Sequence, residues 1–281
     1  MIFGGDVILA RAVAQTMERT KQSPLRHVRD LFRAADIAFV NLESPFSDQP
    51  QLRTAEMIFR ADPAAVEVLK DAGIDIVSTA NNHVRDCGPR GIEFTLDLLE
   101  KNGIAAVGTA ATEAAAHDGR ILERNGVKFG FLAYTYDQAN GNHTTQDPRV
   151  CGLDIARMRQ SVRAMKADAV IVSMHAGVEY ATKPHPSQVT FARAAIDAGA
   201  KLVVGHHPHV IQPPELYNGG LILYSLGNLV FDQNPPATRK GLLAAVTFEG
   251  PQPKSCDLTL VDIVNTAPQP AAGNATSTLL L

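Results

Sequence analysis

The stretch KLVVGHHPHV, residues 201–210, begins as an apolar run and ends in three histidines within four positions. A short apolar run that is bounded by turn residues is typical of a strand buried on both faces. Histidine accounts for only 9 of the 281 residues, so a third of them gather where this strand enters a loop. We interpret the stretch as a core strand that delivers imidazole groups to the edge of a sheet.

Similar apolar runs alternate with helical patterns through most of the chain. In residues 62–73, Asp62 stands where an N-cap is expected, Pro63 suits the first helical position, and Gly73 suits the end of the helix. The apolar run 74–80 follows at once. This order of helix and buried strand is typical of an α/β fold.

Two Asn-Gly pairs lie between apolar runs, at residues 125–126 and 218–219, and each predicts a β-hairpin. Hairpins mixed with helix–strand units favour mixed sheets. We expect a single domain over residues 1–265 and a flexible tail over residues 266–281, which are small and proline-rich. The polar, turn-rich segment 137–152 suits a mobile loop near a site.

The composition excludes several classes of protein. The formal charge is −3 and aromatic residues make up 6% of the chain, so neither a basic field nor a stacking platform for nucleic acid is expected. The three cysteines show no CxxC spacing, which argues against a disulfide framework or a thiolate zinc site.

The sequence also contains no run of about 18 apolar residues, the length that a membrane-spanning helix needs. We therefore expect a soluble chain as given, located in the cytoplasm. If an export signal or anchor was trimmed, the location would instead be extracytoplasmic or membrane-associated.

Polar side chains follow six of the apolar runs, at the point where each run ends. They are Asp6; Asn41 and Glu43; Asn81, Asn82 and His83; His175; His206, His207 and His209; and Asn228. Taken singly, each residue is readily explained as a turn former, a cap or a hydrogen-bonded structural residue. Because ligands of open α/β sheets bind outside the carboxyl ends of the strands, we expect the set to converge on one crevice.

The chemistry that needs such a set is metal-assisted hydrolysis. Imidazole suits zinc, manganese and iron, and a carboxylate can bridge two ions. Two ions about 3.5–4 Å apart activate a water molecule and hold the attacking and leaving oxygens. His207 and His209 lie two residues apart, so on an extended segment they would face the same side, and His206 would face the other.

Five stretches carry a resemblance to a known family: GDVILAR, NLESP, STANNHVRDCG, HAGVEY and GHHPHV. They resemble the CapA family of poly-γ-glutamate and capsule synthesis proteins, which shares the calcineurin-like metallophosphoesterase fold. The resemblance covers residues 4–233. It implies a two-sheet α/β/β/α sandwich with the site along one edge.

The resemblance also implies a centre for one or two divalent ions (manganese, zinc, iron or calcium). Its metal ligands would be Asp6, Glu43, Asn82, His175, His207 and His209. Catalytic roles would fall to Asp6, Asn82 and His83, with His83 as general acid. Substrate contacts would come from Asn41, Glu179, Tyr180, His206 and Asn228. The chain departs from the wider pattern at Ile8 and Val84, where this group of folds often has a histidine and an acid.

Three functions remain open at this point. The first is a metal-dependent hydrolase that cleaves an amide or phosphoester with metal-activated water, acting on poly-γ-glutamate or a related anionic polymer or peptide. The second is a non-catalytic component that binds the polymer within a capsule-synthesis membrane complex. The third is a peptide epimerase on the same fold, with Asp6 and a histidine as its acid–base pair.

Overall fold

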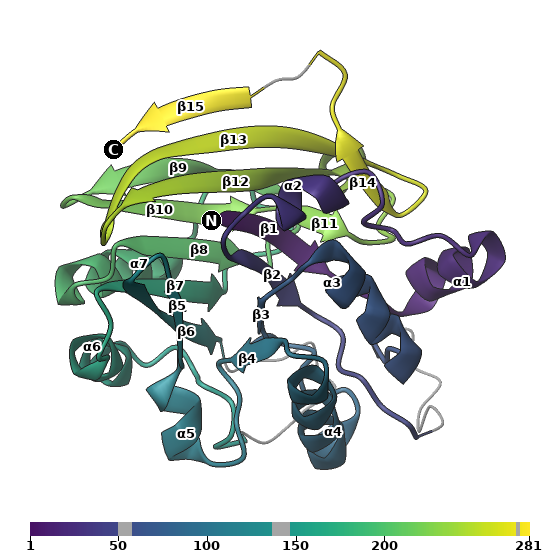
Figure 1. Cartoon of the computed structure of the whole chain (residues 1–281), viewed down its shortest axis with the longest axis horizontal. Helices are drawn as coiled ribbons and strands as arrows, with labels where there is room; N and C mark the ends of the chain where they lie inside the picture. Colours follow the sequence, from purple (N-terminus) through teal and green to yellow (C-terminus); the bar gives the residue numbers. More distant parts are fainter. Residues whose placement is uncertain (50–57, 137–146, 274–275) are drawn as a thin grey trace.

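Two β-sheets form the centre of the protein in the computed structural model (Figure 1). The structure describes residues 1–49, 58–136, 147–273 and 276–281. The first sheet has the order β14-β13-β12-β1-β2-β3-β4, with β11 beside β1 and β15 beside β13; the second has the order β5-β6-β7-β8-β10-β9.

The strands of the first sheet are β1 (Ile2–Val7), β2 (Ala38–Leu42), β3 (Ile76–Ser78), β4 (Ala105–Val107), β11 (Asn228–Val230), β12 (Lys240–Glu249), β13 (Gln252–Val264), β14 (Ala267–Pro270) and β15 (Thr276–Leu280). Those of the second are β5 (Arg120–Arg124), β6 (Val127–Thr135), β7 (Ala169–His175), β8 (Leu202–His206), β9 (Ile211–Tyr217) and β10 (Gly220–Leu226).

Helices cover the outer face of each sheet. Against the first sheet pack α1 (Arg11–Thr20), α2 (Arg29–Arg33), α3 (Val66–Ala72) and α4 (Gly88–Lys101), through an apolar cluster that draws on all four helices. Against the second pack α5 (Glu113–Asp118), α6 (Ile155–Ala164) and α7 (Pro186–Ala198). Short 3-10 turns, η1 (Pro63–Ala65) and η2 (Pro236–Arg239), complete the described elements. In Figure 1, α3 and α4 lie on one side of the molecule and α6 and α7 on the other.

A separate apolar cluster fills the space between the two sheets. Phe3 and Phe39 come from the first sheet, and Phe131 and Val204 come from the second. The rings of Phe39 and Phe131 stack across the interface, with their centroids 6.2 Å apart. The sheets therefore pack face to face with helices outside them. This is a mixed α/β structure with two sheets, as the alternating pattern predicts.

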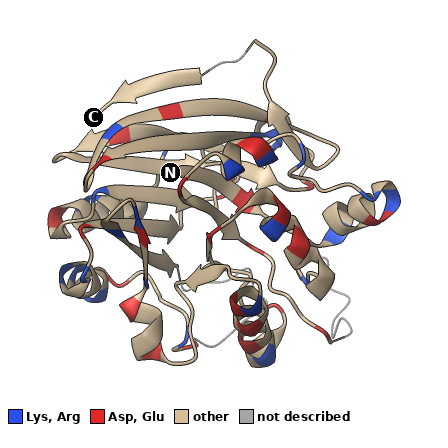
Figure 2. Ribbon diagram, viewed as in Figure 1, with Lys and Arg blue, Asp and Glu red and all other residues tan. Residues whose placement is uncertain are grey.

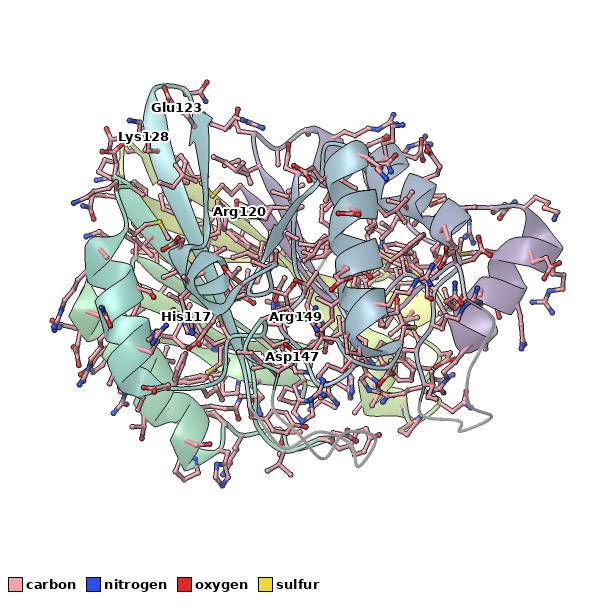
Figure 3. All side chains as sticks on the ribbon, turned by 90° about the horizontal axis from the view of Figure 1, so that it is seen from below. His117, Arg120, Glu123, Lys128, Asp147 and Arg149 are labelled. Atoms are coloured by element: carbon pink, nitrogen blue, oxygen red, sulfur yellow. The ribbon has the colours of Figure 1, made fainter. Side chains whose placement is uncertain are left out.

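The local signals that the sequence carries are found in the structure. Asp62 caps the turn that leads into α3 by accepting a hydrogen bond from the amide of Ala64 at 2.9 Å, and Gly73 ends the helix with a φ of 76°. Both predicted hairpins form, as β5–β6 and β9–β10. Figure 3 shows Glu123 and Lys128, which face one another across β5 and β6, near the tip of the first hairpin.

Residues 266–281, for which the sequence predicts a flexible tail, instead include two strands. β14 pairs with β13 from Val264 to Val261, and β15 pairs with the same strand from Ser255 to Thr259. The physical reason is the edge of β13, whose N–H and C=O groups on the side away from β12 need partners. Backbone pairing thus holds a segment whose composition alone suggests loose chain.

The surface carries charges of both signs. Acidic and basic residues are interspersed along α3 and α4 (Figure 2). Arg149 forms ion pairs with Asp147 at 2.8 Å and with Glu93 of α4 at 2.9 Å, and Figure 3 shows Asp147 and Arg149 side by side. None of the helices among the described residues combines the length and apolarity that a bilayer crossing requires.

The strand directions bring the predicted site together. β1, β2, β3 and β4 are mutually parallel, as are β6, β7, β8 and β10, so their carboxyl ends gather at one edge. In register, Asp6 lies beside Asn41 and Asn228 in the first sheet, and His175 lies beside His206 in the second.

Glycines permit the close strand crossings at this edge. A Cβ at Gly5, which precedes Asp6, would lie 1.9 Å from the carbonyl oxygen of Gly227. A Cβ at Gly205, which precedes His206, would lie 1.9 Å from the carbonyl oxygen of Tyr224. Because no side chain fits at either position, the neighbouring strands approach closely enough for their end residues to meet.

Candidate metal centre

The strand-end residues that the sequence singles out lie together and are buried. Each of the strand-end residues identified from the sequence, the first being Asp6 and the last Asn228, is at most 5% exposed. Burying so many polar groups costs free energy unless each finds a partner. The partners therefore show what the cluster is built to hold.

Asp6 lies at the middle of the cluster. Its carboxylate accepts hydrogen bonds from the side-chain amide of Asn41 at 2.9 Å and from the backbone amide of His207 at 3.2 Å. The Nδ1 atoms of His206 and His209 lie 3.3 and 3.4 Å from its two oxygens. Burial alone would raise the pKa of Asp6, but hydrogen bonds and charge from the two histidines outweigh it and hold the pKa well below its usual value.

Asn41 links the two sheets. Its Nδ2 atom donates to Asp6 and also lies 3.2 Å from Nδ1 of His175, which comes from the second sheet. Asn81 supports Asn41 from behind: its own Nδ2 atom is 3.4 Å from Oδ1 of Asn41 and donates to the carbonyl of Leu42 at 2.8 Å. These amides fix the ring of His175, whose Nε2 atom lies 2.8 Å from Oδ1 of Asn82.

Glu43 is the exception in this network. Both of its carboxylate oxygens are buried without a hydrogen-bond partner among the described residues. Its Oε1 atom lies 3.7 Å from Nε2 of His175 and 3.9 Å from Nε2 of His209. Burial, followed by the charges of Asp6, Glu179 and Asp86, raises the pKa of Glu43 well above its usual value. A carboxylate left without partners between two imidazoles is what a cation site requires.

His207 and His209 reach the cluster from a turn, not from the extended segment that the sequence suggests. Both have left-handed backbone conformations, with φ of 96° and 58°. A non-glycine residue in such a conformation costs roughly 1–3 kcal/mol and is kept mainly at functional sites. The rings still face one cluster: their centroids are 6.0 Å apart, and the ring of His207 lies 4.9 Å from that of His175.

Three residues predicted to contact substrate are fully buried supports of this cluster. His206 packs between Asp6 and the ring of Phe39, whose centroid is 6.1 Å away. Oδ1 of Asn228 lies 2.9 Å from Nδ1 of His209, and because an amide oxygen can only accept, that nitrogen carries the proton. Asn41, described above, is the third.

His83 lies beside the cluster with two neighbours that sequence reasoning missed. Its Nδ1 atom is 2.7 Å from Oδ2 of Asp86, and its ring stacks on Phe59 with centroids 3.7 Å apart. Asp86 also accepts the backbone amide of Phe59 at 2.7 Å. The spacing of His83 and Asp86, three residues apart, is a signal that could have found the pair; Phe59 carried none, because its contact is tertiary.

Glu179 and Tyr180 follow β7 and lie at the solvent side. Glu179 is only partly buried, and Tyr180 is 51% exposed. The hydroxyl of Tyr180 accepts a hydrogen bond from Gln233 at 3.3 Å, and its ring centroid is 6.4 Å from that of His209. Of the predicted mobile segment 137–152, residues 137–146 lie outside the described part of the chain.

Three groups among the described residues could hold a metal ion. Within each, the candidate ligand atoms all lie within 4.8 Å of one another. The groups are Glu43, His175 and His207; Asp6, Glu43 and His209; and Glu179, His207 and His209.

The protonation states of the histidines fit a metal. Burial, and then the charge of His207, lowers the pKa of His175 well below its usual value. Burial, and then the charge of His209, lowers the pKa of His207 to about 3. Both rings are therefore neutral at pH 7, which is the form that ligates metal. Neutral imidazoles beside a partnerless carboxylate suit a divalent ion.

Comparison with known proteins identifies the family of this chain. Residues 1–233 match the model of a family described as bacterial capsule synthesis protein PGA_cap. The chain is 34% identical to the PGA biosynthesis protein CapA of Bacillus subtilis (strain 168), with 95% of this chain and 72% of that protein covered. It is 30% identical to the capsule biosynthesis protein CapA of Bacillus anthracis, with 96% and 69% covered.

A solved structure shares the fold. The crystal structure of a hypothetical protein from Thermus thermophilus superposes with a TM-score of 0.57 at 18% identity, covering 93% of this chain and 98% of that one. Because the family model spans most of the chain and the CapA relatives align over nearly all of it, this protein belongs to the bacterial capsule synthesis family PGA_cap.

Proposed function

We propose that this chain is a metal-dependent hydrolase of capsule-polymer metabolism, built on the α/β/β/α architecture of the calcineurin-like metallophosphoesterases. The observation that carries the proposal is Glu43, whose buried carboxylate lacks a hydrogen-bond partner among the described residues and lies between two imidazoles. If that carboxylate bound nothing, its burial would only destabilise the folded state.

The ligands in this proposal are the buried groups that converge on Glu43. They are Asp6, Glu43, Asn82, His175, His207 and His209. Glu43 belongs to two of the candidate groups, so it is suited to bridge two ions. The mixed nitrogen and oxygen donors favour zinc, manganese or iron over calcium, which prefers oxygen ligands alone.

A bound ion of this kind would activate a water molecule and polarise the bond to be cleaved. The chain's own residues do the rest. Asp86 accepts the Nδ1 proton of His83 and fixes the ring, so that His83 can deliver a proton to the leaving group through its other nitrogen. Asn82, next to His83, offers an amide to the anionic intermediate.

The relatives suggest the substrate class. Two of them are named for PGA and capsule biosynthesis, so we infer that poly-γ-glutamate, or a related anionic polymer or peptide, is the substrate. The bond cleaved would be an amide or a phosphoester. The chain would act beside the capsule-synthesis membrane complex that makes the polymer.

Metal stoichiometry tests this proposal. The purified chain is dialysed against manganese or zinc, and bound metal is measured by elemental mass spectrometry. We expect one to two ions per chain in the wild type and a marked loss in the double variant His207→Ala, His209→Ala. His185→Ala is a matched control, because His185 caps α7 through Ser187 and lies outside the candidate groups. A wild-type chain that binds neither metal would rule out the hydrolase.

A second candidate is a non-catalytic component that binds the polymer. The relatives' names favour it, because they describe synthesis and not degradation. Incubation of the metal-loaded chain with poly-γ-glutamate separates the two: shortening of the polymer, lost in His83→Ala with metal retained, supports hydrolysis. Binding without product supports the second candidate. The epimerase receives no support, because its acid–base residue Asp6 is fully buried and already engaged.

A further inference from the structure

We propose that Glu179 is an additional metal ligand, which reaches the centre from the solvent side and can be displaced. This inference rests on the metal centre proposed above and extends it beyond the buried ligands. It replaces the role in substrate contact that the sequence suggests for Glu179.

The geometry of one candidate group carries the proposal. A carboxylate oxygen of Glu179 lies within 4.8 Å of ligand nitrogens of both His207 and His209. Glu179 is the one member of that group that is not buried, whereas the members of the other two groups among the described residues are all buried. The buried ligands therefore lie on the protein side of the centre, and Glu179 lies on the side that faces solvent.

A second observation points to a ligand at the same place. Nδ1 of His207 is buried and has no hydrogen-bond partner among the described residues, and His207 as a whole is only 3% exposed. Glu179 likewise forms no ion pair with lysine or arginine within the described part of the chain. An unpartnered imidazole and a carboxylate without a basic partner, this close together, are the groups that a shared cation would satisfy.

The backbone holds Glu179 in this position. Two residues before it, Gly177 has a φ of 121°, and a Cβ there would lie 2.4 Å from Oε1 of Gln188. Just after it, Tyr180 adopts a φ of 66°, and its amide donates to the carbonyl of Pro208 at 2.8 Å. Pro208 lies between the two ligand histidines, so this bond ties the loop of Glu179 to theirs. A glycine that a side chain could not replace on one side, and a left-handed Tyr180 on the other, indicate a constrained position.

The charge of Glu179 also acts on the centre. After burial, it is the largest contribution that raises the pKa of Tyr136, whose ring centroid lies 4.8 Å from that of His207. It also raises the pKa of Glu43, after burial and Asp6. Negative charges that oppose one another across a small space are stabilised together when a cation binds between them.

Access to solvent explains why Glu179 would be displaceable. A buried ligand is held in place by its neighbours, whereas a carboxylate that reaches solvent can turn towards it at little cost. An oxygen of an incoming substrate can therefore take its place on the ion, which keeps one coordination position open for chemistry.

Cobalt binding to the chain tests this inference directly. The metal-free wild type, Glu179→Gln and the control Glu123→Gln are titrated with Co²⁺, and visible absorption reports the ligands while elemental analysis reports stoichiometry. Glu123 is exposed on the β5–β6 hairpin and belongs to none of the candidate groups. His209→Ala, which removes a buried ligand, sets the scale for a full loss.

We expect Glu179→Gln to weaken the binding of at least one Co²⁺ ion by about tenfold or more and to change the absorption spectrum at saturation, with Glu123→Gln unchanged. Unaltered affinity and spectrum in Glu179→Gln would overturn the inference and leave the proposed centre standing. Weaker binding with an unaltered spectrum would also overturn it, because charge alone would then be acting. Failure of the wild type to bind Co²⁺ would overturn the centre itself, and this inference with it.

Discussion

Replacing Glu43 by methionine should make the metal-free protein more stable. The carboxylate is fully buried and both of its oxygens lack hydrogen-bond partners among the described residues. A buried polar group without partners costs about 1–3 kcal/mol. Methionine is apolar and of nearly the same length, so Glu43→Met removes this cost without opening a cavity.

The expected gain in the free energy of unfolding is therefore about 1–3 kcal/mol. In a chain somewhat above the 150–250-residue range, each kcal/mol raises the melting temperature by about 2–4 °C at most. Added metal should reverse the order of the two proteins. At a free metal concentration of 1,000 times Kd, the wild type gains about 4.1 kcal/mol, whereas Glu43→Met gains little because a shared ligand is missing.

Chemical unfolding with and without manganese, followed by circular dichroism, measures both differences. Gln188→Met is the matched control: Gln188 is equally buried but bonded, with its amide 3.1 Å from Oε1 of Gln212 and its own oxygen accepting from the amide of His185 at 2.8 Å. That variant should lose about 1–3 kcal/mol. If metal-free Glu43→Met were instead destabilised as much as Gln188→Met, Glu43 would be a structural residue and the reasoning would fail.

Three further predictions concern individual residues. Asp86→Asn should lower turnover by about 10–100-fold with bound metal unchanged, because His83 loses the acceptor that fixes its ring; parallel loss of metal and turnover would assign Asp86 to the centre instead. Gly205→Ala should prevent folding, since its Cβ would lie 1.9 Å from a backbone carbonyl oxygen of β10, whereas Gly152→Ala, with no atom within 4 Å of the new Cβ, should express as soluble protein. Burial, and then the charge of Asp86, raises the pKa of Cys87 to about 11, so less thiolate is present at pH 8 than in an ordinary thiol. Its alkylation by iodoacetamide, followed by mass spectrometry, should speed up about tenfold per pH unit and keep rising beyond pH 9; a plateau near pH 9 would contradict this.

Much of the centre was predictable because strand-end position is a local property of the sequence. The six apolar runs end in the polar residues that meet in the structure, and parallel strands bring such ends to one edge. The capped helix after Asp62 and the hairpin at Asn125 and Gly126 were predictable for the same reason: their signals act within a few residues. Local preference needs no knowledge of the rest of the chain.

Other features needed the folded chain. The left-handed turn that carries His207 and His209 is held by a hydrogen bond from the amide of His207 to Asp6, a residue 201 positions away. Phe59 meets His83 only because α4 and its preceding loop pack against the first sheet. Contacts of this range are set by packing, and no pattern within a short window records them.

The sequence by itself therefore determined the α/β class, the family resemblance and the residues that gather at the strand ends. Only the tertiary structure decided that His206, Asn41 and Asn228 support the centre from buried positions, and that Glu43 is left without a partner among the residues described. The strand pairing near the C-terminal end was also decided by the tertiary structure, because β15 forms only where the edge of β13 offers hydrogen-bonding groups. The physical reason is the same in each case. Whether a residue is buried, and which groups it bonds to, depends on the neighbours that folding brings near it and not on the residue alone.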